Sequence, residues 1–108
     1  MRSEAREQNE ALFRNVNEQI EAISQTLPTV QAMEYLCECD DLNCQNMVWA
    51  TPAEYESVRA EPTHFIVLPT HVDPRVEHVV SLHDRFAVVE KEGAAATKAK
   101  ENDPRERA

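Results

Sequence analysis

The chain has 108 residues, of which 42 % are hydrophobic, and this is enough for one domain with a packed core. It carries 20 acidic residues against 11 Lys and Arg, a formal net charge of −9. Such a charge repels phosphate backbones and anionic lipids, which argues against a nucleic-acid-binding protein and against a membrane-surface protein.

The N-terminal segment, residues 1–27, is predicted to form an amphipathic helix that ends at Pro28. One face of this helix is an apolar stripe. The stripe has two interpretations, because it either covers a sheet of the same chain or forms a helix-to-helix seam in a homodimer. Its apolar residues recur at intervals of three or four: Leu12, Val16, Ile20, Ile23 and Leu27.

Residues 28–91 are predicted to form a small α+β domain. Thr51 and Glu54 have the spacing of a capping box, with Pro52 at the first helical position, so a short helix is expected there that ends at Pro62. Runs rich in β-formers flank this helix, and the last two suit a hairpin: 33–37, 47–49, 65–68, 76–82 and 86–90. We expect a mainly antiparallel sheet that carries the long N-terminal helix and the short one.

The remaining segment, residues 92–108, is rich in Ala, Lys and Glu and contains four basic and four acidic residues. It offers no apolar stripe that would need burial. We therefore expect a disordered tail.

The cysteines give the strongest signal, a C-x-C-x4-C loop formed by Cys37, Cys39 and Cys44. Alternate residues of an extended segment point the same way, so the first two thiolates share one side. The turn-forming residues 40–43 allow Cys44 to fold back toward them. Three converging thiolates favour zinc, which prefers soft ligands in a tetrahedron. The alternative is three cysteines without a metal, but Glu38 and its acidic neighbours make this loop too polar for a core, and Glu38 itself is expected to be a solvated charge.

A fourth ligand is needed, and the chain offers His64, His71, His78 and His83. His71 follows Pro69 and Thr70 just after a strand end, from where a loop can approach the cysteines without disturbing a sheet. A neutral imidazole also limits the charge at the metal, because zinc with three thiolates already carries −1. Strand alternation accounts for His78 and His83 without a metal.

The cysteine loop resembles the zinc segment that follows SET methyltransferase domains, where a distant ligand also completes the site. That likeness covers about eight residues of local geometry.

A wider resemblance covers most of residues 9–91, which look like a group of small uncharacterised bacterial proteins, mostly actinobacterial. The matching segments are 9–18, 37–44, 51–59, 65–71 and 88–91. The resemblance places a histidine at His71, and it implies glycine where Asp40 and Thr70 stand, which predicts unusual backbone angles at both positions. It carries no known activity.

These features predict a cytoplasmic structural-zinc protein that acts as an interaction or regulatory module. Its partner would be an unknown protein or a second copy bound through the N-terminal helix. One alternative is a thiol-based redox or metal sensor that releases zinc on oxidation. A zinc hydrolase is a weaker alternative, because three thiolates blunt the Lewis acidity of the metal and no other catalytic motif is present. We therefore expect no enzymatic activity.

Overall fold

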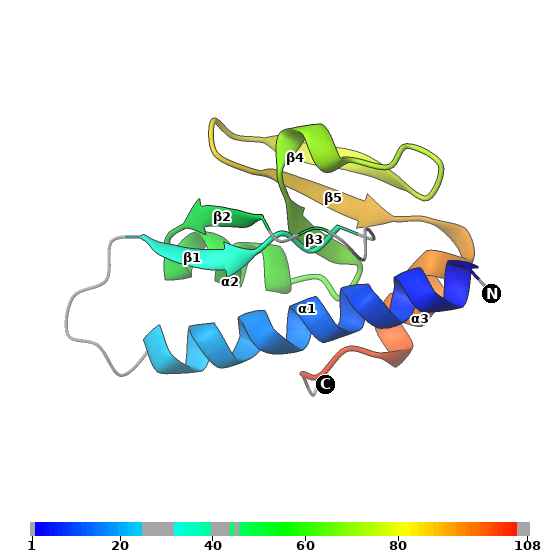
Figure 1. Ribbon diagram of the computed structural model, residues 1–108, viewed down its shortest axis with the longest axis horizontal. Coiled ribbons are helices and arrows are strands. Elements are labelled where there is room, and N and C mark those ends of the chain that lie inside the picture. The colour runs from blue at the N-terminus through cyan, green and yellow to red at the C-terminus, as the bar shows by residue number, and fades with distance from the viewer. Residues whose placement is uncertain (1, 25–31, 40–43, 45, 106–108) are drawn as a thin grey trace.

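The computed structural model describes residues 2–24, 32–39, 44 and 46–105 (Figure 1). Helices and antiparallel sheets both contribute, so the predicted α+β class is confirmed. The elements in chain order are α1 (Arg2–Ser24), β1 (Met33–Leu36), β2 (Met47–Ala50), α2 (Pro52–Arg59), β3 (His64–Val67), the 3-10 turn η1 (Pro69–His71), β4 (Glu77–Leu82), β5 (Ala87–Lys91) and α3 (Gly93–Glu101).

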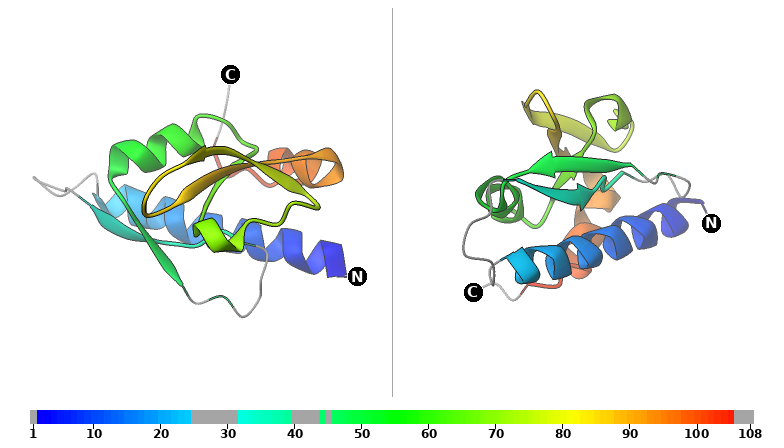
Figure 2. Two further views of the ribbon diagram at one scale, coloured as in Figure 1. Left: turned by 90° about the horizontal axis from the view of Figure 1, so that it is seen from above. Right: turned by 60° about the vertical axis from the view of Figure 1, so that its left-hand side comes forward.

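The strands divide between two antiparallel sheets, where the sequence predicted one. β1 pairs with β2, and the other three strands lie in the order β3-β5-β4. The predicted hairpin is confirmed, because β4 and β5 are neighbours and the His83 N–H donates to the Phe86 carbonyl at 2.9 Å. This hairpin lies on the opposite side of the molecule from α1 (Figures 1 and 2).

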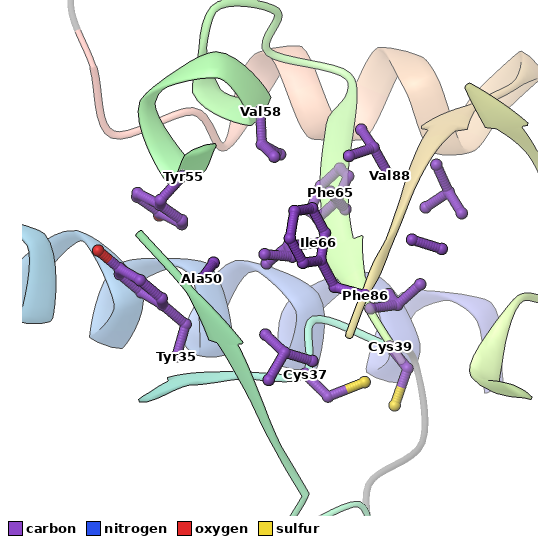
Figure 3. Packing of buried hydrophobic residues seen from close by; sticks show 14 of the residues in the cluster. Tyr35, Cys37, Cys39, Ala50, Tyr55, Val58, Phe65, Ile66, Phe86 and Val88 are labelled. Carbon is purple, nitrogen blue, oxygen red and sulfur yellow. The ribbon is translucent and has the colours of Figure 1, made fainter. Parts of the chain in front are cut away.

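A short connection joins the two sheets beside β3. The Glu38 N–H donates to the Ile66 carbonyl at 2.8 Å, and the Ile66 N–H donates to Glu38 Oε1 at 3.1 Å. The chain that leaves β1 therefore runs alongside β3. As a result, residues of both sheets contribute to one hydrophobic core (Figure 3).

The short helix α2 begins as the sequence predicted. The Thr51 side chain accepts from the Glu54 N–H at 3.1 Å, and the Glu54 side chain accepts from the Thr51 N–H at 2.8 Å, which completes the capping box. Its buried residues Tyr55 and Val58 face the core, where Tyr55 stacks on Tyr35 of β1 with ring centroids 4.5 Å apart. This helix therefore ties β1 to the rest of the domain.

Helix α1 buries a different face from the predicted apolar stripe. Leu12 and Ile23 are 57 % and 59 % exposed, whereas Arg14, Asn17 and Glu21 are buried. At 100° per residue these two sets lie on opposite sides of the helix. The expectation that the whole stripe covers a sheet is therefore wrong, because α1 meets β1 and β3 through polar groups that bond to their backbone. The predicted end of the helix, including Leu27, lies outside the described residues.

The predicted disordered tail is also wrong for residues 93–101, which form α3. This helix packs against α1 and β5, and its residue Ala99 is 7 % exposed in the core. Because its alanines are small, α3 approaches α1 and β5 closely without an apolar stripe of large residues. The sequence pattern therefore did not indicate burial.

Charged side chains hold the segment after α3 in place. Arg59 is fully buried, and it donates to Glu18 at 2.9 Å and to Asp103. Arg105 donates to Glu18 at 2.6 Å and 2.8 Å and to Glu56 at 2.7 Å. Burial would raise the pKa of Glu18, but hydrogen bonds from Arg105 and Arg59 lower it below its usual value. Residues 103 and 105 are therefore part of the folded domain.

Candidate metal centre

The structure brings together the four residues that the sequence singled out. The sulfurs of Cys37, Cys39 and Cys44 and a ring nitrogen of His71 all lie within 4.8 Å of one another. Among the described residues no disulfide joins any of the three cysteines. Cys37 and Cys39 lie side by side at the edge of the core (Figure 3).

The β1–β2 hairpin positions the three cysteines. Cys37 follows β1 directly, and its N–H donates to the Asn46 carbonyl at 3.1 Å, which extends the hairpin one step beyond the strands. Extended backbone then places Cys37 and Cys39 on one side and Glu38 on the other. Cys44 precedes β2 on the returning arm, and its sulfur lies with those of Cys37 and Cys39, as predicted.

The turn η1 delivers His71 from the end of β3. Its N–H donates to the Leu68 carbonyl at 2.9 Å, which folds the chain back after the strand. The Leu68 N–H donates to Cys37 Sγ at 3.2 Å and so fixes the turn against the cysteine loop. Among the described residues no non-glycine has a positive φ, so the unusual backbone predicted for Thr70 is wrong. Asp40 lies outside the described residues.

The distances suit a tetrahedral metal. Nδ1 of His71 lies 3.5 Å from Cys37 Sγ and 3.5 Å from Cys44 Sγ. Zinc bonds of about 2.3 Å to sulfur and about 2.0–2.1 Å to nitrogen give a tetrahedron whose S···N edge is about 3.5–3.6 Å. The residues present therefore fit a zinc ion held through Nδ1, with four protein ligands around it.

A divalent ion would change the protonation of the cluster. Burial raises the pKa of the Cys44 thiol, and the nearby Cys39 raises it further, against a hydrogen bond from the Asn46 backbone that lowers it. Asn46 Nδ2 donates to the same sulfur at 3.7 Å. Crowded sulfurs resist a negative charge, and a divalent ion among them reverses that preference and stabilises the thiolates.

Glu38 is not the solvated charge that the sequence suggested, because its side chain is fully buried. Oε2 accepts from Asn17 Nδ2 at 2.9 Å, and Oε1 accepts from the Ile66 N–H. Asn17 also accepts from the Leu36 N–H at 2.6 Å and donates to the Leu36 carbonyl at 2.9 Å. Sequence reasoning missed Asn17 and Glu38 as supports of the loop, and only the strand alternation of the C-x-C segment hinted that Glu38 points away from the thiolates.

The other three histidines lie outside the cysteine cluster. His64 and His78 pair with Glu90, and His83 contacts Ser81 at 3.1 Å and stacks on Phe86. Of the four candidates, the cluster therefore contains His71, as predicted.

Fold and site together define a small α+β protein with a Cys3His cluster suited to a metal ion. Comparisons of the chain with protein-family models, with curated proteins and with solved structures found no match. The resemblance to a group of bacterial proteins therefore stays a prediction. Within the described part of the chain, no helix has both the length and the apolar character needed to cross a bilayer.

Proposed function

We propose that this is a cytoplasmic structural-zinc protein that acts as an interaction or regulatory module. The observation that carries the proposal is the Cys3His cluster, whose ligands come from both arms of one hairpin and from the turn after β3. A zinc ion there would clamp the β1–β2 sheet to the β3-β5-β4 sheet. Four protein ligands leave no coordination position for a reacting water, which favours a structural over a catalytic metal and supports a protein without enzymatic activity.

The proposed interaction surface is the exposed apolar face of α1. Leu12 and Ile23 lie three turns apart on this face, opposite the side that packs on the sheets. Large apolar residues in such a row favour contact with another apolar helix, either from a second copy of this chain or from a different protein. A second copy is the simplest partner, because its own α1 carries the same face.

Sedimentation velocity over a range of concentrations tests this proposal. We expect the zinc-loaded chain to self-associate and the Leu12→Glu/Ile23→Glu variant to remain a monomer, with both retaining zinc. The matched control is Ala53→Glu/Ser57→Glu, which adds the same two charges at exposed positions of α2. A wild type that is monomeric at every concentration would exclude the homodimer, and retention of a protein by wild type but not by the double variant would then identify another partner.

A thiol-based sensor is the second candidate, favoured by unequal burial of the ligands. Cys37 and Cys39 are 1 % and 3 % exposed, whereas Cys44 is only half-buried. An oxidant therefore reaches Cys44 first, and its oxidation would remove one ligand from the metal. Zinc release at low peroxide, reversed by a thiol reductant and accompanied by oxidation of Cys44 before Cys37 and Cys39 in mass spectra, would support this function. Release only under conditions that oxidise the whole protein would exclude it.

A further inference from the structure

The three cysteines of the candidate metal centre differ in how well the fold shields their sulfurs. Cys37 and Cys39 are members of the buried core, whereas Cys44 is only partly buried and packs against that core from its edge. A reagent in solution therefore meets Cys44 before the other two sulfurs. The groups that contact Cys44 consequently bear on how readily a thiolate leaves the proposed zinc ion.

Asn46 contacts both arms of the cysteine loop. Its carbonyl accepts from the Cys37 N–H at 3.1 Å. Its backbone N–H and its side-chain amide both donate to Cys44, with Nδ2 at 3.7 Å from Sγ. The backbone of Asn46 therefore links the two arms, while its side chain contacts the sulfur of Cys44.

The position of this amide is compatible with a metal-bound sulfur. Nδ1 of His71 lies 3.5 Å from Cys44 Sγ, which is the edge of the tetrahedron that would surround the ion. A thiolate that binds zinc keeps lone pairs that do not face the metal, and these accept hydrogen bonds. Cys44 can therefore bind zinc and accept from Asn46 at the same time.

The charge of the centre gives such donors a role. Three thiolates, one zinc ion and a neutral imidazole together carry one net negative charge. An N–H group that points at a thiolate stabilises its charge and makes it a weaker nucleophile. Cys37 receives this bond from the Leu68 backbone at 3.2 Å, whereas Cys44 receives one from the side chain of an exposed residue.

From these contacts we infer that Asn46 is a positioning residue of the metal centre, whose side-chain amide holds the accessible thiolate of Cys44 and lowers its reactivity. The inference rests on the proposed zinc centre and extends it, because it names the group that controls how readily one ligand leaves the metal. Since Asn46 is exposed, its side chain can be changed without disturbing the core.

Alkylation of the zinc-loaded chain tests the inference. Asn46→Leu keeps the size of the side chain and its backbone bonds but removes the amide donor. We expect iodoacetamide to alkylate Cys44 about three- to tenfold faster in this variant, the low end of what outer partners of a metal ligand contribute, because the N···S distance is long. Sγ displaces iodide in this reaction, and peptide mass mapping assigns the resulting thioether to one cysteine.

A spectroscopic measurement separates this role from a purely structural one. Loss of an N–H donor raises the energy of the sulfur electrons. In the Co²⁺-loaded protein, the thiolate-to-cobalt absorption band of Asn46→Leu and of Asn46→Ala should therefore lie at longer wavelength than that of the wild type. Asn15→Leu, the same change at an exposed position of α1, is the matched control and should equal the wild type in both measurements.

Two results would overturn the inference while leaving the zinc centre intact. One is an equal alkylation rate and an identical cobalt band in Asn46→Leu and the wild type, with one metal ion bound to each. The other is faster alkylation without a band shift in either Asn46 variant, because the side chain then only shields the sulfur from the reagent. A wild type that binds no metal would overturn the zinc centre and the inference together, so the two failures are distinguishable.

Discussion

Asn17 of α1 donates a 2.9 Å hydrogen bond to Glu38, the residue between Cys37 and Cys39. The helix is thereby bonded to the back of the cysteine loop, while the thiolates face the opposite side. The same amide also satisfies both backbone groups of Leu36. The loop that holds the candidate metal site is therefore supported by a polar side chain of a helix that is distant in the sequence.

We predict that Asn17→Ala destabilises the zinc-loaded protein by about 1–3 kcal/mol, because it leaves buried groups of Leu36 and Glu38 without their partner. Gln19→Ala, at an exposed position of the same helix, is the control and should change stability by less than about 0.5 kcal/mol. Denaturant unfolding of both variants measures the difference. Equal midpoints for the two would show that the bonds of Asn17 do not stabilise the fold.

Deletion of residues 93–108 is predicted to lower stability by about 3 kcal/mol, because it removes the buried partner Asp103 of Arg59 and the core residue Ala99. For a chain of this size the melting temperature should fall by roughly 10 °C or more. Lys98→Ala is the control, since Lys98 pairs with Glu101 at the surface. An unchanged melting temperature for the deletion would mean that α3 contributes nothing to the fold in solution.

The salt bridges of Glu18 predict that the stability of the folded protein decreases in acid. Its pKa is lowered in the folded protein, so its contribution to stability is present above the unfolded value of about 4.3 and is lost as the pH falls through the folded value. Glu18→Gln should therefore be less stable than the wild type at pH 7. The gap between their free energies of unfolding should narrow below about pH 4. Urea unfolding at a series of pH values measures it, with the exposed Glu34→Gln as control. A gap that stays constant down to pH 3 would contradict this account.

Chelation of the metal is predicted to loosen the hairpin that carries the cysteines more than the rest of the domain. Metal affinity contributes to folding free energy, by about 4 kcal/mol for an ion present at a thousandfold its Kd. After chelation, amide exchange should accelerate first in β1 and β2, while β5, the central strand of the other sheet, keeps more protection. Added zinc should restore the original pattern. An unchanged thermal transition and unchanged exchange would make the metal dispensable for the fold.

Local patterns predicted most of the elements, because their signals depend on neighbouring residues. The capping box at Thr51, the hairpin around His83 and the alternation that places Cys37 with Cys39 all act over a few positions. His71 was predicted from its place after a strand end, from the charge of the loop and from the resemblance to a group of bacterial proteins. The structure brings it to the cysteines through η1.

Sequence patterns did not predict the buried faces of α1 and α3, because polar groups and small residues form these contacts. α1 uses Arg14 and Asn17 to bond to backbone groups of other segments, and hydrophobic periodicity cannot detect such a face. Ala99 packs in the core because it is small. Hydrophobic periodicity therefore did not distinguish the alanine-rich C-terminal segment from a solvated tail. The pairing of His64 and His78 with Glu90 was equally hidden, because only the register of three strands shows that these residues lie opposite one another.

The Cys3His centre is tested most directly by the zinc affinity of four single variants, each with one histidine changed to alanine. Competition with a chromophoric chelator, together with metal analysis, should find one tightly bound zinc in the wild type and in the His64, His78 and His83 variants. His71→Ala should bind that zinc at least about tenfold more weakly, because it removes the only neutral ligand of the tetrahedron. A His71→Ala variant that holds zinc as tightly as the wild type, or a wild type that binds none, would contradict the proposed centre.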